Sequence, residues 1–405
     1  MQDVTDTPAS PLRPRDQRER TVLIVDDSVT ARAALKLMIS EESGWRVVGT
    51  AADGEQGLAK IRELDPDVVV MDYEMPVMNG LEAIRTLRTF SQVPVVVLSG
   101  STPRASRKAM MLFEAGASDV ISKHPGGPAA GVNALRGPLI ARLNALTHRG
   151  GAQQANGTSR SLSSHCSPHA GRAPLMLIGA STGGPPALEE FLDALPAEMN
   201  APVVIAQHMP EMFTAALTER LHERGSRPVC LAEDGMALDA GCVYVAPGGK
   251  HTQLRRDAGG ALRLRVGDEP AAAPYRPSVD ALFSSAAKCV GSDLVAAVLT
   301  GMGDDGLLGA RDVVDAGGKV VAQDAASCVV YGMPRAVIEA GLATASMPPK
   351  DLAMCVSRIA RRLNDFNNIG CRRSDSAATQ AAAAPISPFH SSKYRITSSM
   401  LGLLT

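Results

Sequence analysis

The sequence predicts an α/β protein made of two doubly wound domains with parallel sheets. Short runs of β-branched residues alternate with segments of helical periodicity, the alternation stops once near the middle of the chain, and it then begins again. Unbroken apolar strands separated by helices are typical of parallel sheets that helices cover on both faces. With 405 residues, of which 45% are hydrophobic, the chain is long enough for two such cores.

The first series of strands and helices lies between residues 20 and 147. In the segment Thr30–Ile39, residues Ala31, Leu35 and Met38 fall at helical spacing. Five strand–helix units predict a flavodoxin-type domain. The expected strands are Thr21–Val25, Arg46–Ala51, Val68–Met71, Val95–Leu98 and Val120–Ser122.

The second series follows a stretch rich in Gly, Ser, Gln and His, and it predicts a Rossmann-like domain. Its expected strands are Leu175–Ala180, Val203–Ala206, Cys242–Ala246, Leu294–Thr300 and Lys319–Gln323. Its expected helices are Ala187–Leu195, Met212–Glu223, Val279–Val290 and Pro334–Ala340. The predicted organisation is a disordered leader (1–19), a first domain (20–147), a flexible linker (148–172), a second domain (173–363) and a disordered tail (364–405).

Composition excludes several classes of protein. Lys and Arg total 41 against 42 for Asp and Glu, so no net positive charge is available to attract nucleic acid or an acidic membrane. The seven cysteines are scattered and form no C-x-x-C pair. No apolar run reaches the roughly 18 residues that a membrane span needs, and no secretory signal is present. We expect a soluble cytoplasmic protein with reduced thiols, no nucleic-acid partner and no direct membrane insertion.

Five polar residues follow the strands of the first domain, at the edge where α/β sheets gather their functional groups. A cluster of carboxylates needs a cation, and oxygen ligands suit Mg²⁺, for which Asp27 and Asp72 are the expected ligands. Asp72 is then placed to attack a phosphoryl group, and the hydroxyl of Ser99 to bond the new phosphate. Any one of these residues could instead be a turn or helix cap, but all five together favour a phosphorylation pocket. They are Asp26, Asp27, Asp72, Ser99 and Lys123.

The first domain resembles the receiver domains of response regulators in four motifs, LIVDDS, VVVMDYEMPVMNG, VVVLSGST and DVISKHP. The resemblance implies Mg²⁺-dependent phosphorylation of Asp72 by a histidine autokinase. Two positions depart from the receiver pattern. Val120 stands where receivers usually have an aromatic switch residue, and His124 separates Lys123 from Pro125.

Three residues of the second domain indicate nucleophilic catalysis. Ser181 follows the first strand in a Gly-x-Ser-x-Gly turn, His208 follows the second strand, and Asp304 and Asp305 come shortly after a later strand. A nucleophile, a base and an orienting carboxylate are thereby offered at one edge of one sheet. The chain order Ser, His, Asp is not that of α/β-hydrolases.

In this interpretation His208 takes the proton from Ser181 as the serine attacks an ester carbonyl, and an aspartate fixes the imidazole tautomer. The expected oxyanion donors are backbone N–H groups of Thr182 and of the loop Gly301–Gly303, which includes Met302. A serine that only caps a helix is the simpler alternative for the Gly-x-Ser-x-Gly turn taken alone. No cofactor is expected in this domain.

The second domain resembles the chemotaxis protein-glutamate methylesterases in six motifs, LIGASTGGP, VIAQHMP, CVYVAPGGKH, YRPSVDALF, LTGMGDDGLLGA and QDAASCVVYGMP. The resemblance implies a triad of Ser181, His208 and Asp305, favours Asp305 over Asp304, and assigns Met302 to the oxyanion loop. It implies hydrolysis of γ-glutamyl methyl esters on the cytoplasmic helices of methylated chemoreceptors. In some members receptor glutamines are also deamidated.

Two other functions remain as alternatives. A DNA-binding regulator would need a basic recognition module, which the second half of the chain lacks. A phosphate-binding module would use the Gly-rich turn at Ser181 alone and would not need His208 and Asp305. For the fused hydrolase, we expect the unphosphorylated first domain to obstruct the triad and phosphorylation of Asp72 to loosen that contact.

Overall fold

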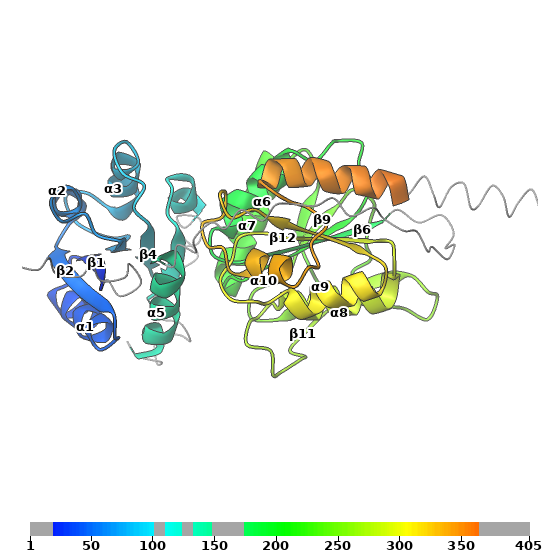
Figure 1. Ribbon diagram of the computed structural model, residues 1–405, viewed down its shortest axis with the longest axis horizontal. Coiled ribbons are helices and arrows are strands. Elements are labelled where there is room, and N and C mark those ends of the chain that lie inside the picture. The colour runs from blue at the N-terminus through cyan, green and yellow to red at the C-terminus, as the bar shows by residue number, and fades with distance from the viewer. Residues whose placement is uncertain (1–18, 101–109, 124–132, 148–173, 364–405) are drawn as a thin grey trace, which may run out of the picture.

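The computed structural model describes residues 19–100, 110–123, 133–147 and 174–363 (Figure 1). The predicted leader and tail fall almost wholly outside these residues, and so does the predicted linker. Among the described helices, none combines the length and apolar character that crossing a membrane requires. The described chain forms two α/β domains, each around its own parallel sheet.

The first domain contains a five-stranded sheet in the order β2-β1-β3-β4-β5, and all its strand pairs are parallel. This is the flavodoxin order, so the predicted fold is confirmed. The strands are β1 (Arg20–Val25), β2 (Trp45–Ala51), β3 (Val68–Asp72), β4 (Val95–Ser99) and β5 (Asp119–Ser122). The helices are α1 (Val29–Ser40), α2 (Gly54–Leu64), α3 (Gly80–Leu87) and α5 (Asn133–Thr147).

Polar residues start three of these helices by accepting backbone hydrogen bonds. The side chain of Ser28 accepts from the amide of Ala31, and that of Asp53 from the amide of Gln56. Asn79 and Glu82 form a reciprocal capping box at the start of α3. Such caps satisfy N–H groups that the first helical turn leaves unbonded, and they fix where each helix leaves the sheet edge.

The second domain contains a seven-stranded parallel sheet in the order β14-β13-β12-β6-β7-β9-β8 and a separate hairpin, β10–β11. The sheet strands are β6 (Leu175–Ala180), β7 (Val203–Gln207), β8 (Val229–Leu231), β9 (Val243–Val245), β12 (Leu294–Val298), β13 (Lys319–Gln323) and β14 (Ser346–Met347). The hairpin strands are β10 (His251–Arg256) and β11 (Leu262–Gly267). The helices are α6 (Gly184–Asp193), α7 (Glu211–Arg224), α8 (Val279–Val290), α9 (Leu307–Asp315) and α10 (Met333–Glu339), and a further helix covers residues 349–363.

The five predicted strands of this domain are present, but the predicted number of strands was too low. β8 and β14 have only three and two residues, too few to show a period of two. The hairpin strands carry arginines at exposed positions, so they do not resemble the buried runs of a parallel sheet. Helix α9 was also not predicted, although its Gly-rich start lies in the motif that contains Asp305.

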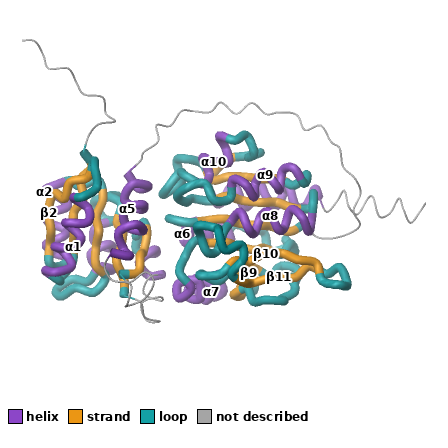
Figure 2. Tube along the Cα trace, turned by 90° about the horizontal axis from the view of Figure 1, so that it is seen from below, coloured by secondary structure: helices purple, strands orange, loops and turns teal. Residues whose placement is uncertain are grey.

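The sheet order places the end of β6 between the ends of β7 and β12. Strands β7, β8 and β9 lie on one side of β6, and strands β12, β13 and β14 lie on the other side, so the direction of winding reverses here. Such a reversal is where open α/β sheets hold their ligands. Helix α5 of the first domain lies on the side that faces the second domain (Figures 1 and 2).

Candidate active site

Ser181 lies in the turn that joins β6 to α6. Gly183 in this turn has a φ of 77°, and a Cβ added there would come within 2.5 Å of the Cβ of Val329, so glycine is required. The amide of Ser181 donates to the carbonyl of Thr300 (3.0 Å), which ties the turn to the end of β12. Ser181 is only 5% exposed. The turn therefore fixes the serine in a largely enclosed position at the sheet edge.

His208 follows β7 and lies beside Ser181. Ala180 pairs with Gln207 in the β6–β7 register, and the amide of His208 donates to the carbonyl of Ala180 (2.9 Å). The side-chain amide of Gln207 donates to the carbonyl of Ser181 (2.9 Å). These bonds hold Ser181 and the imidazole of His208 at the ends of paired strands, as the sequence predicts.

The imidazole of His208 is bonded through one nitrogen only. Its Nε2 lies 2.7 Å from Oδ2 of Asp305, and its buried Nδ1 has no hydrogen-bond partner among the described residues. The hydroxyl of Ser181 also makes no hydrogen bond within the described part of the chain. Catalytic hydrogen bonds often form only once substrate is bound. Because an ionised carboxylate only accepts, Nε2 carries the proton and Nδ1 is the basic nitrogen.

Asp305 is buried and accepts three further hydrogen bonds. They come from the amides of Val279 (2.7 Å) and Asp280 (2.9 Å) and from the hydroxyl of Ser278 (3.1 Å). Burial alone would raise the pKa of Asp305, but the hydrogen bond and charge of His208 and the two amides together lower it. Asp304 is exposed. Of the two candidate aspartates, only Asp305 bonds to the histidine.

The loop after β12 approaches the serine closely. A Cβ added to Gly301 would lie 2.7 Å from the Cβ of Ser181 and 2.3 Å from Sδ of Met333, so only glycine allows this approach. The amide of Gly301 donates to the carbonyl of Val330 (3.0 Å) and is not a free donor. The amides of Thr182 and Met302 have no acceptor among the described residues. They remain the candidate oxyanion donors.

The five predicted pocket residues of the first domain lie at the carboxyl ends of its strands. Ligand oxygens of Asp26, Asp27 and Asp72 all lie within 4.8 Å of one another. Nζ of Lys123 is 2.7 Å from Oδ2 of Asp72 and 3.3 Å from Oδ2 of Asp26. The hydroxyl of Ser99 is buried and has no hydrogen-bond partner among the described residues. An all-oxygen set of three carboxylates is consistent with a Mg²⁺ site.

Burial and neighbouring charges shift the pKa values of Asp72 and Lys123 in opposite directions. Burial raises the pKa of Asp72, and the nearby Asp26 carboxylate adds to this, although Lys123 acts to lower it. Burial lowers the pKa of Lys123, but its bonds to Asp72 and Asp26 outweigh that effect and raise it. The carboxylate cluster is thus incompletely neutralised by one lysine, which favours a bound cation.

Sequence reasoning missed Tyr275 at the second site, and it did not connect Asp280 with Asp305. The ring of Tyr275 stacks on the imidazole of His208, with ring centroids 4.3 Å apart and an interplanar angle of 12°. Oδ1 of Asp280 accepts from the amides of Gly306 (2.9 Å) and Gly309 (2.7 Å) beside Asp305. Both residues belong to the motif YRPSVDALF, which could have directed attention to them.

Direct contacts join the two domains beside the site. The hydroxyl of Thr182 donates to Oδ2 of Asp119 on β5 (2.8 Å), and this contact is buried. Val330 and Met302 pack in the same hydrophobic cluster as Leu135 and Leu139 of α5. The first domain therefore contacts the residue that follows Ser181, and it shares a hydrophobic cluster with the loop that carries Met302.

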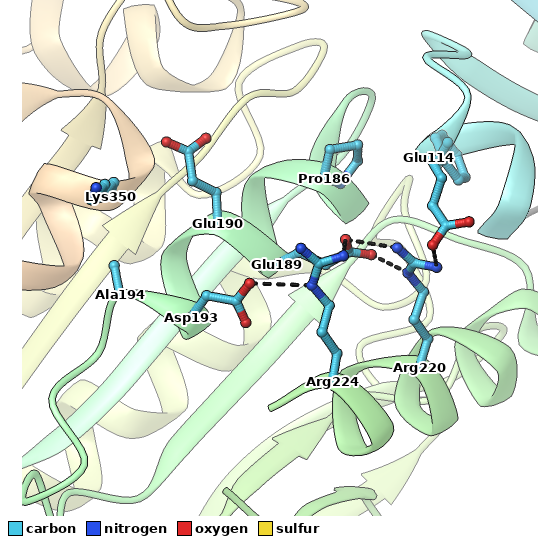
Figure 3. A pocket seen from close by; sticks show the side chains of 10 residues that line it. Glu114, Pro186, Glu189, Glu190, Asp193, Ala194, Arg220, Arg224 and Lys350 are labelled. Carbon is cyan, nitrogen blue, oxygen red and sulfur yellow. Dashed lines mark hydrogen bonds and ion pairs between the residues drawn. The ribbon is translucent and has the colours of Figure 1, made fainter. Parts of the chain in front are cut away.

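A second polar contact lies at a cavity of 680 Å³ between the domains (Figure 3). Arg220 on α7 bonds to Glu189 on α6 and also to Glu114 of the first domain. Arg224 lies beside it and bonds to Asp193 (3.2 Å). The side chain of Arg220 is held within its own domain by Glu189, so only its bond to Glu114 crosses the interface.

Comparisons with known proteins agree with these two sites. The family described as response regulator receiver domain matches residues 22–133, and the family described as CheB methylesterase matches residues 176–356. A protein-glutamate methylesterase/protein-glutamine glutaminase of Desulfitobacterium hafniense is 37% identical over 386 residues, covering 84% of this chain and 98% of the relative. One from Myxococcus xanthus is 40% identical over 348 residues, with coverage of 84% and 98%. One from a Nocardioides species is 41% identical over 352 residues, with coverage of 84% and 95%.

These relatives span both domains, and the residues that carry each site lie within the matched segments. The chain therefore belongs to the family of chemotaxis protein-glutamate methylesterases/protein-glutamine glutaminases, with an N-terminal receiver domain and a C-terminal methylesterase domain.

Proposed function

We propose that this chain hydrolyses glutamate γ-methyl esters on chemoreceptor helices with a Ser181–His208–Asp305 triad, and that phosphorylation of Asp72 activates it. The observation that carries the proposal is the bond from His208 to Asp305 at the ends of adjacent strands, with Ser181 between them in the sheet. In chemotaxis, removal of methyl groups from receptors resets their signalling output, so the proposed role is adaptation. Both the receptor helices and a histidine autokinase as phosphodonor would be met in the cytoplasm.

The reaction follows from the protonation states at the site. Nδ1 of His208 takes the hydroxyl proton of Ser181 as its oxygen attacks the ester carbonyl, and Asp305 stabilises the imidazolium that forms. Amides of Thr182 and Met302 hold the negative oxygen of the tetrahedral intermediate. The intermediate expels methoxide, which takes the proton from His208 and leaves as methanol. Water then attacks the acyl-serine by the same steps and releases the glutamate.

The same site is suited to glutamine deamidation. Attack of Ser181 on the side-chain amide gives the same acyl-serine, and the leaving group takes the proton from His208 and departs as ammonia. Nothing else in the mechanism changes. Deamidation is therefore a second reaction of one site and needs no second set of residues.

Phosphorylation in the receiver pocket would control the rate of ester hydrolysis in the second domain. Asp26, Asp27 and Asp72 would hold Mg²⁺, which balances the charge of a phosphoryl group on Asp72 when bound. Lys123 already contacts Asp72 and would pair with a phosphoryl oxygen. The unpartnered hydroxyl of Ser99 would gain an acceptor there, and its movement would be felt along β4 and β5.

The contact between Thr182 and Asp119 supports inhibition by the unphosphorylated receiver. It places β5 against the residue next to the nucleophile, where a receptor helix would need to enter. A conformational change at the receiver pocket can be transmitted along β5, because Lys123 follows that strand directly.

Methanol release from methylated receptor fragments tests the catalytic assignment. We expect Ser181→Ala to lower the rate at least about 10³-fold while circular dichroism shows an unchanged fold, because the variant lacks the hydroxyl proposed to form the acyl intermediate. A well-folded variant with a rate within about twofold of wild type would contradict the triad.

A further inference from the structure

Tyr275 lies over the face of the catalytic imidazole. Its ring and that of His208 are nearly parallel, with centroids 4.3 Å apart and an interplanar angle of 12°. The side chain of His208 is only 5% exposed. Tyr275 precedes α8, whose first residues donate to Asp305, so the segment that carries the ring also holds the carboxylate that bonds to the histidine.

The hydrogen bonds at the site leave the imidazole incompletely fixed. Asp305 holds only Nε2, and Nδ1 has no partner within the described part of the chain. A ring bonded at one nitrogen can still turn about that bond, and turning would move Nδ1 away from the serine. Contact with a parallel aromatic face opposes this rotation.

The same ring acts on the charge that develops during the reaction. His208 becomes positively charged when it takes the proton of Ser181, and the face of an aromatic ring attracts a cation. The attraction is stronger in the transition state than with the neutral imidazole, so it contributes to rate and not to substrate binding. Both acylation and deacylation protonate His208, so both steps depend on it.

The ring, and not the hydroxyl, makes the contact that matters. No hydrogen bond of the Tyr275 hydroxyl is found among the described residues. The hydroxyl oxygen of Tyr275 lies beside Gly303, because a Cβ added to Gly303 would be 3.1 Å from that oxygen. The hydroxyl thus lies over the oxyanion loop without bonding to it, and phenylalanine would keep the stacked face.

We propose that Tyr275 is a positioning residue for His208, which fixes the plane of the imidazole and stabilises its protonated form. This inference rests on the proposed hydrolase function. If Tyr275 acts in this way, the loop before α8 directly affects the rate of the chemical step.

The test compares Tyr275→Phe and Tyr275→Leu in the full-length chain with a small acyl phosphate as phosphodonor. We expect Leu to lower kcat about tenfold, equivalent to about 1.4 kcal/mol, with KM for methylated receptor unchanged within about twofold. Phe should retain kcat within about threefold. Hydrolysis of a small aryl ester should fall in the same ratio, because that substrate makes no receptor-specific contacts. Tyr275→Met provides a second apolar variant if the Leu variant does not fold.

Three results would overturn the inference: folded Leu and Met variants with wild-type kcat, a change confined to KM, or an equal loss of kcat in the Phe variant, which would assign the effect to the hydroxyl. Ser181→Ala, assayed in parallel, separates this inference from the proposed function. If Ser181→Ala abolishes methanol release while Tyr275→Leu behaves as wild type, only the role of Tyr275 fails. If Ser181→Ala retains activity, the hydrolase mechanism itself fails.

Discussion

At the scale of single residues, the paired carboxylates of Asp280 and Asp305 organise the methylesterase site. Asp305 accepts from the amide of Asp280, and Asp280 accepts from the amides of Gly306 and Gly309, which follow Asp305. Burial raises the pKa of Asp280 to about 6 and is the largest effect. The hydrogen bond from the amide of Gly309 lowers this pKa, and the negative charge of Asp305 raises it. The pKa of Asp305 is lowered while that of Asp280 is raised, so Asp280 is the carboxyl of the pair that takes up a proton first as pH falls.

This proton predicts a pH dependence of stability. The pKa of Asp280 is about 6 in the folded protein, above its ordinary value of 3.8, so between these values the folded state binds more protons than the unfolded state. Stability therefore falls as pH rises through this window, and the loss persists above it. In Asp280→Asn the amide group takes the place of the protonated carboxyl. We expect the melting temperature of this variant, relative to wild type, to rise between about pH 4 and pH 6 and then to level off.

Differential scanning calorimetry across this pH range measures the effect. Asp304→Asn is the matched control, because Asp304 is exposed and adjacent to the same pair. A difference between Asp280→Asn and wild type that does not change with pH would show that Asp280 is ionised in the folded protein throughout the range.

At the scale of elements, the sequence was informative where a strand is buried on both faces. Val68–Asp72 is entirely buried and consists of apolar residues up to the final aspartate, so both the strand and the position of Asp72 at its end were predictable. Ser181 and His208 were predictable because they follow strands of the same kind, β6 and β7. The positions of the proposed catalytic residues thus followed from where apolar runs end.

Contacts made by irregular segments were not predictable in this way. Tyr275 lies in a stretch without periodicity, and only the tertiary fold brings it over His208. His251 follows the turn Pro247–Gly249 and lies on β10, where it is fully buried and its Nδ1 accepts from the amide of Ser278 (3.3 Å). The sequence around a histidine that follows a turn does not indicate whether its side chain lines a cleft or is buried in the core.

The loop after β12 gives a prediction at this scale. In Gly301→Ala the new methyl group would overlap Ser181 and Met333, so the loop must move away from the serine. Because amides of this loop are the expected oxyanion donors, we expect kcat to fall about 10²-fold with a modest change in KM. Gly267→Ala is the matched control, since a Cβ there meets nothing within 4 Å. Steady-state methanol release would test this, and an unchanged kcat in a folded Gly301→Ala variant would remove the loop from the mechanism.

At the scale of the whole molecule, the interface between the domains connects the two sites. Asp119 on β5 contacts Thr182, and Glu114 contacts Arg220, so two polar contacts hold the receiver against the edge of the methylesterase sheet. Arg142 also bonds to Asp119 (3.3 Å) and orients it from within the receiver. An interaction between the domains was expected because a phosphorylation domain is fused to a hydrolase. Of the contacting receiver residues, Asp119 lies in the motif DVISKHP, whereas Glu114 lies outside the receiver motifs.

Breaking the first of these contacts should activate the enzyme without a phosphodonor. We expect Asp119→Ala to raise basal methanol release several-fold, because loss of one buried charge-assisted hydrogen bond corresponds to roughly 1.5 kcal/mol or more. Deletion of residues 1–150 should raise it further. Glu41→Ala is the matched control, since it removes a carboxylate of the same domain that pairs with Arg136. Basal activity equal to wild type in both Asp119→Ala and the deletion variant would contradict inhibition by the receiver.

We propose that phosphorylation at one sheet edge controls hydrolysis at another. The rate of methanol release from methylated receptor tests this when it is measured with and without a small acyl phosphate and Mg²⁺, in wild type, Asp72→Asn and Ser181→Ala. We expect stimulation of wild type, a basal and unstimulated rate in Asp72→Asn, and no release by Ser181→Ala in either condition. Equal stimulation of Asp72→Asn and wild type would contradict it.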